Sequence, residues 1–158
     1  MVVSFPPKGG AEVGYGRKGK GSTLELIVEA KGLPIAAHVA GADVHETQLV
    51  EPVLKARFVE EKPERLGADR AYDSDPLDTK LAQQGIEMIA HHRANRKRPK
   101  TQDGRKARRL KRRWKVERCN AWLKAFRRLR VRHEWHVENL LGLVHLACAL
   151  VLLRAILK

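Results

Sequence analysis

Apolar residues in the first half of the chain fall into short runs that predict β-strands. Residues 23–30 and 33–40 are two such runs, and Lys31-Gly32 between them predicts an antiparallel hairpin. Residues 65–68 and 86–90 predict two further strands, and residues 1–5 predict a first one. The stretch 6–22 is rich in glycine, proline and lysine and is expected to be a loop.

Helical spacing of apolar positions predicts four helices, with the two longest at the C-terminal end. Residues 43–57 begin with a capping residue, Asp43, although Pro52 lies inside the pattern. Residues 75–84 have Pro76 at the first position and Gly85 after the end. Residues 92–106 form a polar basic loop, and 108–130 and 137–157 are the long helices. This order predicts an α/β fold in which a mixed sheet is flanked by helices.

Size and composition indicate one globular domain, residues 1–158, of a cytoplasmic protein. Hydrophobic residues make up 43% of the 158 residues. The two cysteines, Cys119 and Cys148, form no CxxC, which favours a reducing compartment. The start of the chain does not resemble a signal peptide. The most apolar stretch, 140–153, is shorter than the ~20 residues that span a bilayer, so we expect a buried helix and no membrane partner.

The positive charge is concentrated in one segment. Residues 93–132 hold 19 of the 32 Lys and Arg residues and 2 of the 18 acids, whereas the whole chain has a formal net charge of +14. Such a cluster repels itself strongly unless a polyanion neutralises it. We therefore expect 93–132 to contact DNA or RNA.

Glycines 14, 16 and 19 spell GxGxxG, and Gly19-Lys20 half-matches a P-loop. Both motifs require a helix after the glycines, so that its N-terminus meets the phosphate. A β-type run follows here, and Gly21 stands where a P-loop has Ser or Thr. The sequence therefore favours a basic loop that touches DNA backbone over a nucleotide site.

Two carboxylates stand out by their positions. Asp69 follows a predicted strand, where it is either a turn residue or a ligand for metal-assisted chemistry. Asp73 and Asp75 fit loop and N-cap positions before Pro76. Glu117 is the single acid on a helix face that it shares with Arg113, Lys124 and Arg128, opposite an apolar stripe of Val116, Cys119, Leu123 and Phe126.

Glu117 has two interpretations, a surface residue paired with Arg113 and a metal-binding carboxylate among phosphate-binding cations. The tryptophans and histidines of the second half of the chain do not choose between these two interpretations. Tryptophans on helices mostly pack, although they also stack on bases. The histidines lack a set of metal partners and are expected at the surface or against backbone. These residues are Trp114, Trp122, Trp135, His91, His92, His133 and His136.

Several strings together resemble the DDE (Asp-Asp-Glu) transposases of bacterial insertion sequences. They are the glycine-rich 14–21, Asp-Arg-Ala-Tyr-Asp at 69–73, Arg-x3-Glu-x6-Lys formed by Arg113, Glu117 and Lys124, Phe-Arg-Arg-Leu at 126–129, and the C-terminal stretches 134–135 and 139–149. The resemblance covers nearly the whole chain. It implies an RNase H-like fold that binds double-stranded DNA, namely element terminal repeats and target DNA, and performs cleavage and strand transfer as a homo-oligomer.

The resemblance also implies a role for individual residues. Asp69 matches the second catalytic aspartate and Glu117 the catalytic glutamate, which in the complete enzyme hold two Mg²⁺ (or Mn²⁺) ions. The matching cations are expected to contact DNA: Arg113, Lys124, Arg127, Arg128, Arg17, Lys18 and Lys20.

Two positions depart from the family pattern. Leu110 stands where the signature has a tyrosine, and Val2 stands where the first strand has the first catalytic aspartate, before Ser4-Phe5. We therefore expect a chain truncated at its N-terminal end, lacking the upstream DNA-binding region, which binds DNA but cleaves it poorly alone. The alternatives are a non-catalytic DNA-binding repressor derived from a transposase and an unrelated RNA-binding basic protein.

Overall fold

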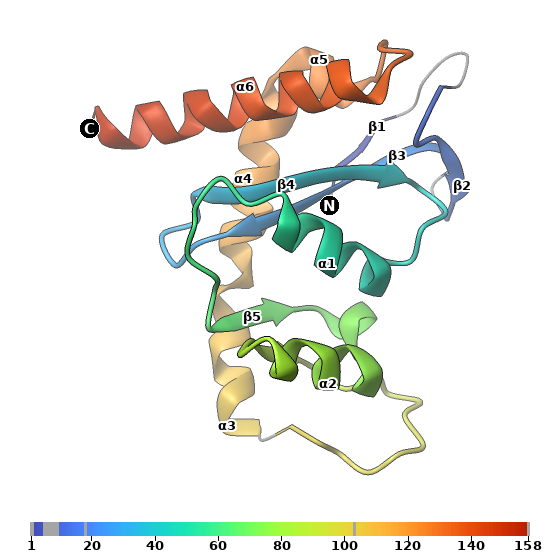
Figure 1. Cartoon of the computed structure of the whole chain (residues 1–158), viewed down its shortest axis with the longest axis vertical. Helices are drawn as coiled ribbons and strands as arrows, with labels where there is room; N and C mark the ends of the chain where they lie inside the picture. The colour runs from blue at the N-terminus through green and yellow to red at the C-terminus, as the bar shows by residue number, and fades with distance from the viewer. Residues whose placement is uncertain (1, 5–9, 18, 103, 158) are drawn as a thin grey trace. The chain divides into compact units, whose positions relative to one another are not determined.

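A computed structural model describes residues 2–4, 10–17, 19–102 and 104–157 of the chain (Figure 1). Two compact units divide these residues. Unit 1 comprises Met1–Val59 and Lys115–Lys158, and unit 2 comprises Glu60–Trp114. The expected α/β class is confirmed, but the described strands form two separate sheets, one in each unit.

The sheet of unit 1 is built around β3 (Gly19–Val28). It pairs antiparallel with β1 (Val2–Ser4), β2 (Gly14–Gly16) and β4 (Pro34–Gly41). The predicted hairpin and first strand are therefore confirmed. The loop expected at 6–22 was wrong at both 14–16 and 19–22, which are β-strand; residues 5–9 lie outside the described part.

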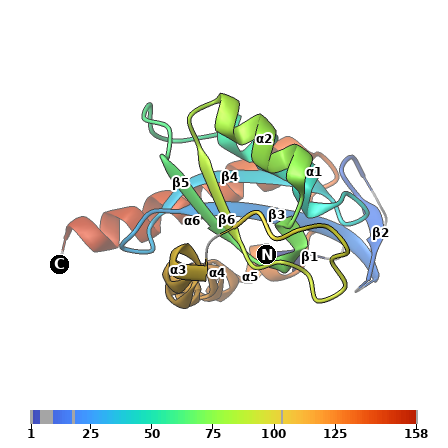
Figure 2. The same cartoon turned by 90° about the horizontal axis from the view of Figure 1, so that it is seen from below.

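Helices cover both faces of this sheet (Figures 1 and 2). On one face α1 (Glu46–Lys55) packs on β3 and β4 through Leu49, Val50, Val53 and Leu54. It begins after His45 rather than after Asp43. It also continues past Pro52, where the burial of Val53 and Leu54 offsets the missing backbone hydrogen bond.

The opposite face of the sheet meets the C-terminal helices in one apolar core. Strand alternation places every second residue of β3 and β4 on this face. Burial raises the pKa of the Cys119 thiol to about 11 and that of Cys148 to about 12, so both are inert protonated thiols. The buried members of the core are Leu24, Leu26, Ala37, Val39, Cys119, Leu123, Leu129, Leu140, Val144, Ala147, Cys148 and Val151.

The expected single helix at 108–130 was wrong, because the segment is divided into three. These are η2 (Arg108–Arg113), α4 (Trp114–Ala125) and α5 (Arg127–Arg130). Five of the six residues of η2 are cations, and like charges three or four residues apart destabilise an α-helix. Phe126 adopts an extended conformation (φ −77°, ψ 111°) and packs against the apolar core, which ends α4.

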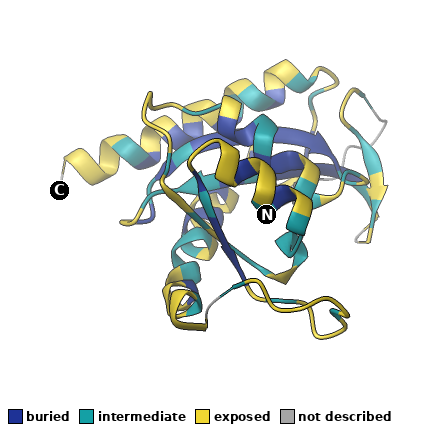
Figure 3. Cartoon of the chain, turned by 60° about the horizontal axis from the view of Figure 1, so that its bottom comes forward, coloured by how far each residue is buried: buried dark blue, intermediate teal, exposed yellow. Residues whose placement is uncertain are grey.

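The last helix, α6 (Val137–Ile156), confirms the predicted bounds 137–157 to within one residue, but it is more exposed than predicted. Its 20 residues and a mean hydropathy of 2.0 suffice in length and composition to cross a membrane, so the expectation that this segment is too short was wrong. The expected burial holds for one face of the helix only, because 28% of its most apolar 18-residue stretch is buried. Figure 3 shows exposed residues along the helix that ends at the C-terminus.

In unit 2 the predicted elements are confirmed closely. Strand β5 (Arg65–Ala68) pairs in parallel with β6 (Glu87–Ala90), and α2 (Asp75–Gln83) connects them. A single 3-10 turn, η1 (Arg70–Tyr72), follows β5 directly. Helix α3 (Gly104–Ala107) is one turn in the expected basic loop.

Unit 1 also contains a fully buried cation, Arg132, between α5 and α6. Its guanidinium donates to Ser22 Oγ at 2.6 Å, Glu134 O at 2.8 Å, Trp135 O at 3.1 Å and Glu12 O at 3.2 Å. Burial lowers the pKa of Arg132, and the charges of Glu134 and Glu12 oppose that shift. One side chain thus joins β3, the segment before β2 and the segment before α6.

Replacing Arg132 by methionine is expected to destabilise unit 1 by about 3 kcal/mol, because several acceptors lose their donor and each unsatisfied one costs roughly 1–3 kcal/mol. Urea unfolding followed by circular dichroism measures the change. The exposed Arg130 provides the control, since Arg130→Met should change stability by less than about 0.5 kcal/mol. Equal unfolding midpoints for the two variants would contradict this role of Arg132.

Candidate functional site

Asp69 lies where β5 ends and caps η1. Its Oδ1 accepts a hydrogen bond from the Ala71 N–H at 2.8 Å, which holds the turn closed. Its Oδ2 lies 3.8 Å from Arg113 Nη2, and 45% of the side chain is exposed. One oxygen therefore has a structural role, whereas the other remains open to a ligand.

Arg113 reaches Asp69 because η2 packs on β5. Leu110 is buried, and a Cβ placed on Gly67 would lie 3.3 Å from Leu110 Cδ2. Leucine at the position where the family signature has tyrosine is therefore an apolar contact that fixes η2. The structure brings together two of the predicted site residues, Asp69 and Arg113, within unit 2.

Asp73 is the centre of a polar network that the sequence did not predict. Its side chain is 3% exposed. Oδ1 meets His92 Nδ1 at 2.9 Å and accepts from Arg96 Nη1 at 2.8 Å, and Oδ2 accepts from the Arg93 N–H at 2.8 Å. Burial alone would raise the pKa of Asp73, but these hydrogen bonds and the charge of Arg96 outweigh it and leave the pKa lowered.

The partners of Asp73 fix the turn that carries Asp69. The guanidinium of Arg93 donates to Arg70 O at 3.1 Å and to Ala71 O at 2.7 Å, which are the backbone carbonyls of η1. Arg96 also donates to Asp75 Oδ1 at 2.6 Å. The start of the basic loop is therefore a brace for the Asp69 turn.

His92 connects the network to the far end of the loop. Its Nε2 accepts from the backbone N–H groups of Thr101 at 3.2 Å and Gln102 at 3.4 Å, so its proton must sit on Nδ1 and point to Asp73. Of the two places expected for the histidines, the surface or a backbone contact, His92 has the second, and its side chain is only 12% exposed. The expected backbone contact is confirmed.

The prediction that Asp75 is the N-cap of helix α2 was wrong. Ser74 is the N-cap of α2, whereas Asp75 is the first helical residue. Asp75 instead pairs with Arg96 and with Arg98 Nη1 at 3.3 Å, and the hydrogen bond from Arg96 lowers its pKa most. Local spacing could not reveal these pairs, since the partners lie 21 to 23 residues away.

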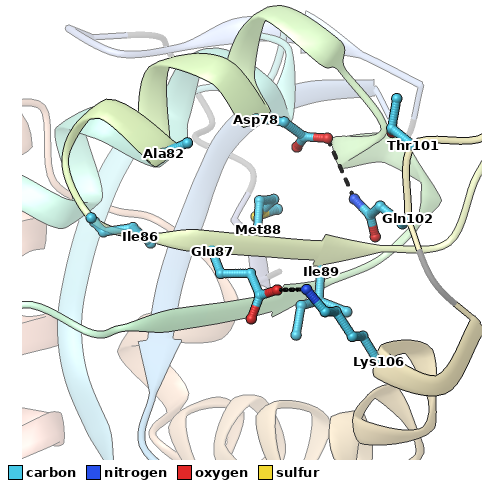
Figure 4. A pocket seen from close by; sticks show the side chains of 10 residues that line it. Asp78, Ala82, Ile86, Glu87, Met88, Ile89, Thr101, Gln102 and Lys106 are labelled. Carbon is cyan, nitrogen blue, oxygen red and sulfur yellow. Dashed lines mark hydrogen bonds and ion pairs between the residues drawn. The ribbon is translucent and has the colours of Figure 1, made fainter.

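The other end of the loop lines a shallow pocket beside α2, where Gln102 is held by two hydrogen bonds (Figure 4). Gln102 Nε2 donates to Asp78 Oδ2 at 3.4 Å, and its Oε1 accepts from the Ala90 N–H at 3.0 Å. Burial raises the pKa of Asp78. Lys106 forms an ion pair with Glu87 on the opposite side of the pocket. Residues 91–102 are thus fixed at both ends.

In unit 1, Glu117 is exposed in the first turn of α4, opposite the buried side of that helix. The predicted apolar stripe is confirmed, with Cys119 and Leu123 fully buried. Neighbouring cations attach α4 to the turn between β3 and β4. Lys115 donates to Ala30 O, and Arg118 donates to Lys31 O at 2.8 Å and lies 4.8 Å from the ring of Trp122.

The remaining predicted DNA contacts are all in unit 1. Lys124, Arg127 and Arg17 are exposed and Lys20 is half-buried, whereas Lys18 lies outside the described residues. Arg128 donates to Glu134 Oε1 at 2.6 Å while its own side chain remains 64% exposed. Among the described residues, no group of three or more His, Cys, Asp or Glu side chains gathers as a metal site.

Asp73→Asn is expected to lower the stability of unit 2 by about 1–3 kcal/mol at neutral pH, because charged hydrogen bonds become neutral ones. Since the folded pKa of Asp73 is lowered, this contribution is present above the unfolded pKa near 4 and disappears as the pH falls further. Hydrogen exchange of the Arg93 and Thr101 amides measures it.

The exposed Glu61 in the same unit provides the control, because Glu61→Gln should leave these amides protected. If Asp73→Asn exchanges as slowly as wild type at neutral pH, Asp73 does not anchor the loop.

Comparisons with known proteins show the family of the chain. The family model described as "Transposase DDE domain" matches residues 2–152. A protein of Burkholderia cepacia, "Putative transposase for insertion sequence element IS402", is 33% identical over 139 residues, which are 83% of this chain and 62% of that protein. The chain thus spans less than two thirds of this relative. No solved structure matches the chain significantly.

The family match extends over nearly the whole chain. The chain therefore belongs to the DDE transposases of insertion sequences.

Proposed function

We propose that the chain binds the terminal repeats of an insertion sequence and target DNA, and that the complete enzyme cleaves and transfers DNA strands in the bacterial cytoplasm. The observation that supports this most is the site around Asp69. A half-exposed carboxylate follows a parallel strand, 3.8 Å from an arginine, on a turn that buried ion pairs hold in place. A carboxylate beside a cation suits a site that receives both a metal and a phosphate.

Exposed cations on the elements around the carboxylates support DNA as the partner. On η2 these cations come directly before Arg113, and in unit 1 they lie along α4 and α5. Many other cations of 93–132 are engaged inside the protein, so a subset of the segment provides the DNA contacts. The proposed subset is Arg108, Arg109, Lys111, Arg112, Lys124, Arg127 and Arg130.

The donor chemistry of Asp69 and Glu117 fits divalent metal, on which DDE transposases generally depend. The Asp69 carboxylate is half-exposed and that of Glu117 is exposed, and hard cations such as Mg²⁺ or Mn²⁺ prefer carboxylate oxygens together with substrate phosphates. We propose that each of these two residues is a ligand of such ions in the complete enzyme, which is expected to hold two. Bound ions supply activation of the attacking hydroxyl and stabilisation of the leaving oxygen.

The protein's own part in this reaction is positioning and neutralisation. Arg113 places positive charge beside the Asp69 carboxylate, where a phosphate would otherwise be repelled. The brace formed by Arg93 and Asp73 keeps the Asp69 backbone in one conformation. A carboxylate held in this way needs little reorganisation when substrate arrives.

A second candidate function is DNA binding without cleavage, as in a repressor derived from a transposase. It is favoured by Val2, which stands in β1 where the family resemblance places the first catalytic aspartate. Two carboxylates leave a pair of hard cations with few anionic ligands. We therefore propose that this polypeptide by itself binds DNA but cleaves it poorly.

The purified chain is expected to bind duplex DNA with a steep salt dependence and to nick plasmid only marginally in Mg²⁺. If six to ten phosphates are neutralised, affinity falls roughly 10³–10⁵-fold between about 50 and 200 mM salt. Arg112→Ala should reduce the slope of log affinity against log salt by about 1. Electrophoretic shift and plasmid-relaxation assays read binding and cleavage.

Lys62→Ala is the matched control, since Lys62 is an exposed cation of unit 2 outside the basic segment. Binding that ignores salt would contradict the DNA interface. Mg²⁺-dependent nicking that Asp69→Ala abolishes would instead overturn the second candidate. Nicking that appears only in the Val2→Asp variant would support the alignment of position 2 with the family's first catalytic aspartate.

We further propose that the chain associates with a second copy through the outer face of α6. Leu146, Leu150, Leu153 and Leu157 are 58%, 37%, 49% and 76% exposed, and they follow one another at four, three and four residues. That spacing is typical of a seam between two paired helices. A helix lying on a membrane surface would need a polar face rich in cations, whereas Arg154 is the single cation of α6.

Leu150→Glu is expected to make the chain monomeric, because it puts a charge into the centre of the seam. Light scattering after gel filtration gives the mass. Ala149→Glu, next to the seam and also exposed, should leave the association unchanged. A wild-type chain that is monomeric, or that binds neutral lipid vesicles instead, would contradict the proposed pairing.

A further inference from the structure

The glycine-rich stretch that suggested a phosphate loop is a β-hairpin. Gly14 pairs with Gly21, Tyr15 with Lys20 and Gly16 with Gly19, so the chain reverses its direction between Gly16 and Gly19. No helix follows the glycines, since β3 continues to Val28. The hairpin therefore lacks the helix N-terminus that a nucleotide phosphate site requires.

The glycines let one face of this hairpin lie against the turn after β4. A Cβ on Gly14 would lie 1.5 Å from Asp43 Oδ1, and a Cβ on Gly16 would lie 2.4 Å from Ala42 O. Only glycine fits at either position. The contact fixes which face of the strand is inside, and it holds the hairpin rigidly on unit 1.

Tyr15 must then point to the other face, because neighbouring residues of a strand alternate. Its side chain is 76% exposed, although a tyrosine ring is largely apolar. Its cross-strand partner Lys20 shares its face, and Arg17 is exposed at the turn. The fold thus presents an aromatic ring to solvent between two cations.

No acid weakens this charge within the hairpin. The sequence from Gly14 to Gly21 contains three cations and no Asp or Glu. Two acids lie beside it: Glu12 accepts the Gly41 N–H through Oε2 at 3.1 Å, and the Asp43 carboxylate lies against Gly14, on the face opposite Tyr15. The ligand that fits such a surface is a polyanion that also offers flat aromatic groups.

A second exposed ring is attached to the base of the hairpin. Trp135 is 58% exposed, and its carbonyl accepts from Arg132. The same guanidinium donates to Ser22 Oγ and to Glu12 O, directly beside the two hairpin strands. Arg132 therefore holds the backbone of this tryptophan to the base of the hairpin.

From these observations we infer that the β2–β3 hairpin binds unpaired DNA nucleotides, with the Tyr15 ring stacked on an unstacked base and Arg17 and Lys20 at the adjoining phosphates. Aromatic rings beside cations are how proteins commonly hold single-stranded nucleic acid, because every base has a flat face. A paired base within a duplex offers no such face. This inference rests on the proposed DNA binding and assigns the hairpin to frayed or single-stranded ends.

The test compares a blunt duplex with the same duplex carrying a single-stranded overhang that contains 2-aminopurine. The full chain is expected to bind the overhang more tightly and to quench its fluorescence. Tyr15→Ala should lose about 5- to 150-fold of the affinity for the overhang, and most of the quenching, without losing duplex affinity. Tyr15→Phe should behave as wild type, since it keeps the ring.

Arg17→Ala is the control for charge, because it should weaken binding to both probes alike. If Tyr15→Ala retains the overhang preference and the quenching while duplex binding remains salt-dependent, the inference fails and the proposed DNA binding stands. If wild type binds neither probe, both fail. Tighter binding to a ribonucleotide overhang would overturn the assignment to DNA.

Discussion

The side chain of Arg132 has no exposed surface, and its guanidinium bonds to its neighbours Glu134 and Trp135 and to Ser22 and Glu12, which lie 110 and 120 residues away. A buried charge is costly unless hydrogen bonds satisfy it, so the segments that supply its acceptors must stay in place. Ser22 belongs to the central strand of the sheet, Glu12 precedes the glycine hairpin, and Trp135 precedes α6. The sheet, the hairpin and the long apolar helix of unit 1 therefore share one constraint.

Unit 2 also depends on a buried charged side chain with several hydrogen-bond partners, but here the buried charge is negative. The buried carboxylate of Asp73 collects His92, Arg93 and Arg96 from a loop that contains little regular structure. Charge-assisted hydrogen bonds are stronger than neutral ones, which lets a short polar loop keep a fixed course. The consequence for function is local, because the braced turn begins with Asp69.

The basic segment 93–132 consequently has two kinds of cation. Some form hydrogen bonds and ion pairs inside the protein, namely Arg93, Arg96 and Arg132. Others, such as Arg112 and Arg127, are exposed and remain available for a polyanion. Net charge alone does not separate the two kinds. A DNA interface built from the exposed cations is smaller than the count of basic residues suggests, and it is attached to a scaffold that other cations hold together.

The sequence by itself determined the strands at β3–β6, the helix α2, the apolar stripe of α4, and the position of Asp69 at the end of a strand. These features depend on periodicity, capping and residue type within a few positions. Together with the motif around Glu117 they also indicated the transposase family. Only the tertiary structure decided that the glycine stretch is a hairpin and that α6 exposes a leucine seam. It also decided that Asp73 and Arg132 are buried anchors, because their partners lie 19 to 23 and up to 120 residues away and no local pattern records them.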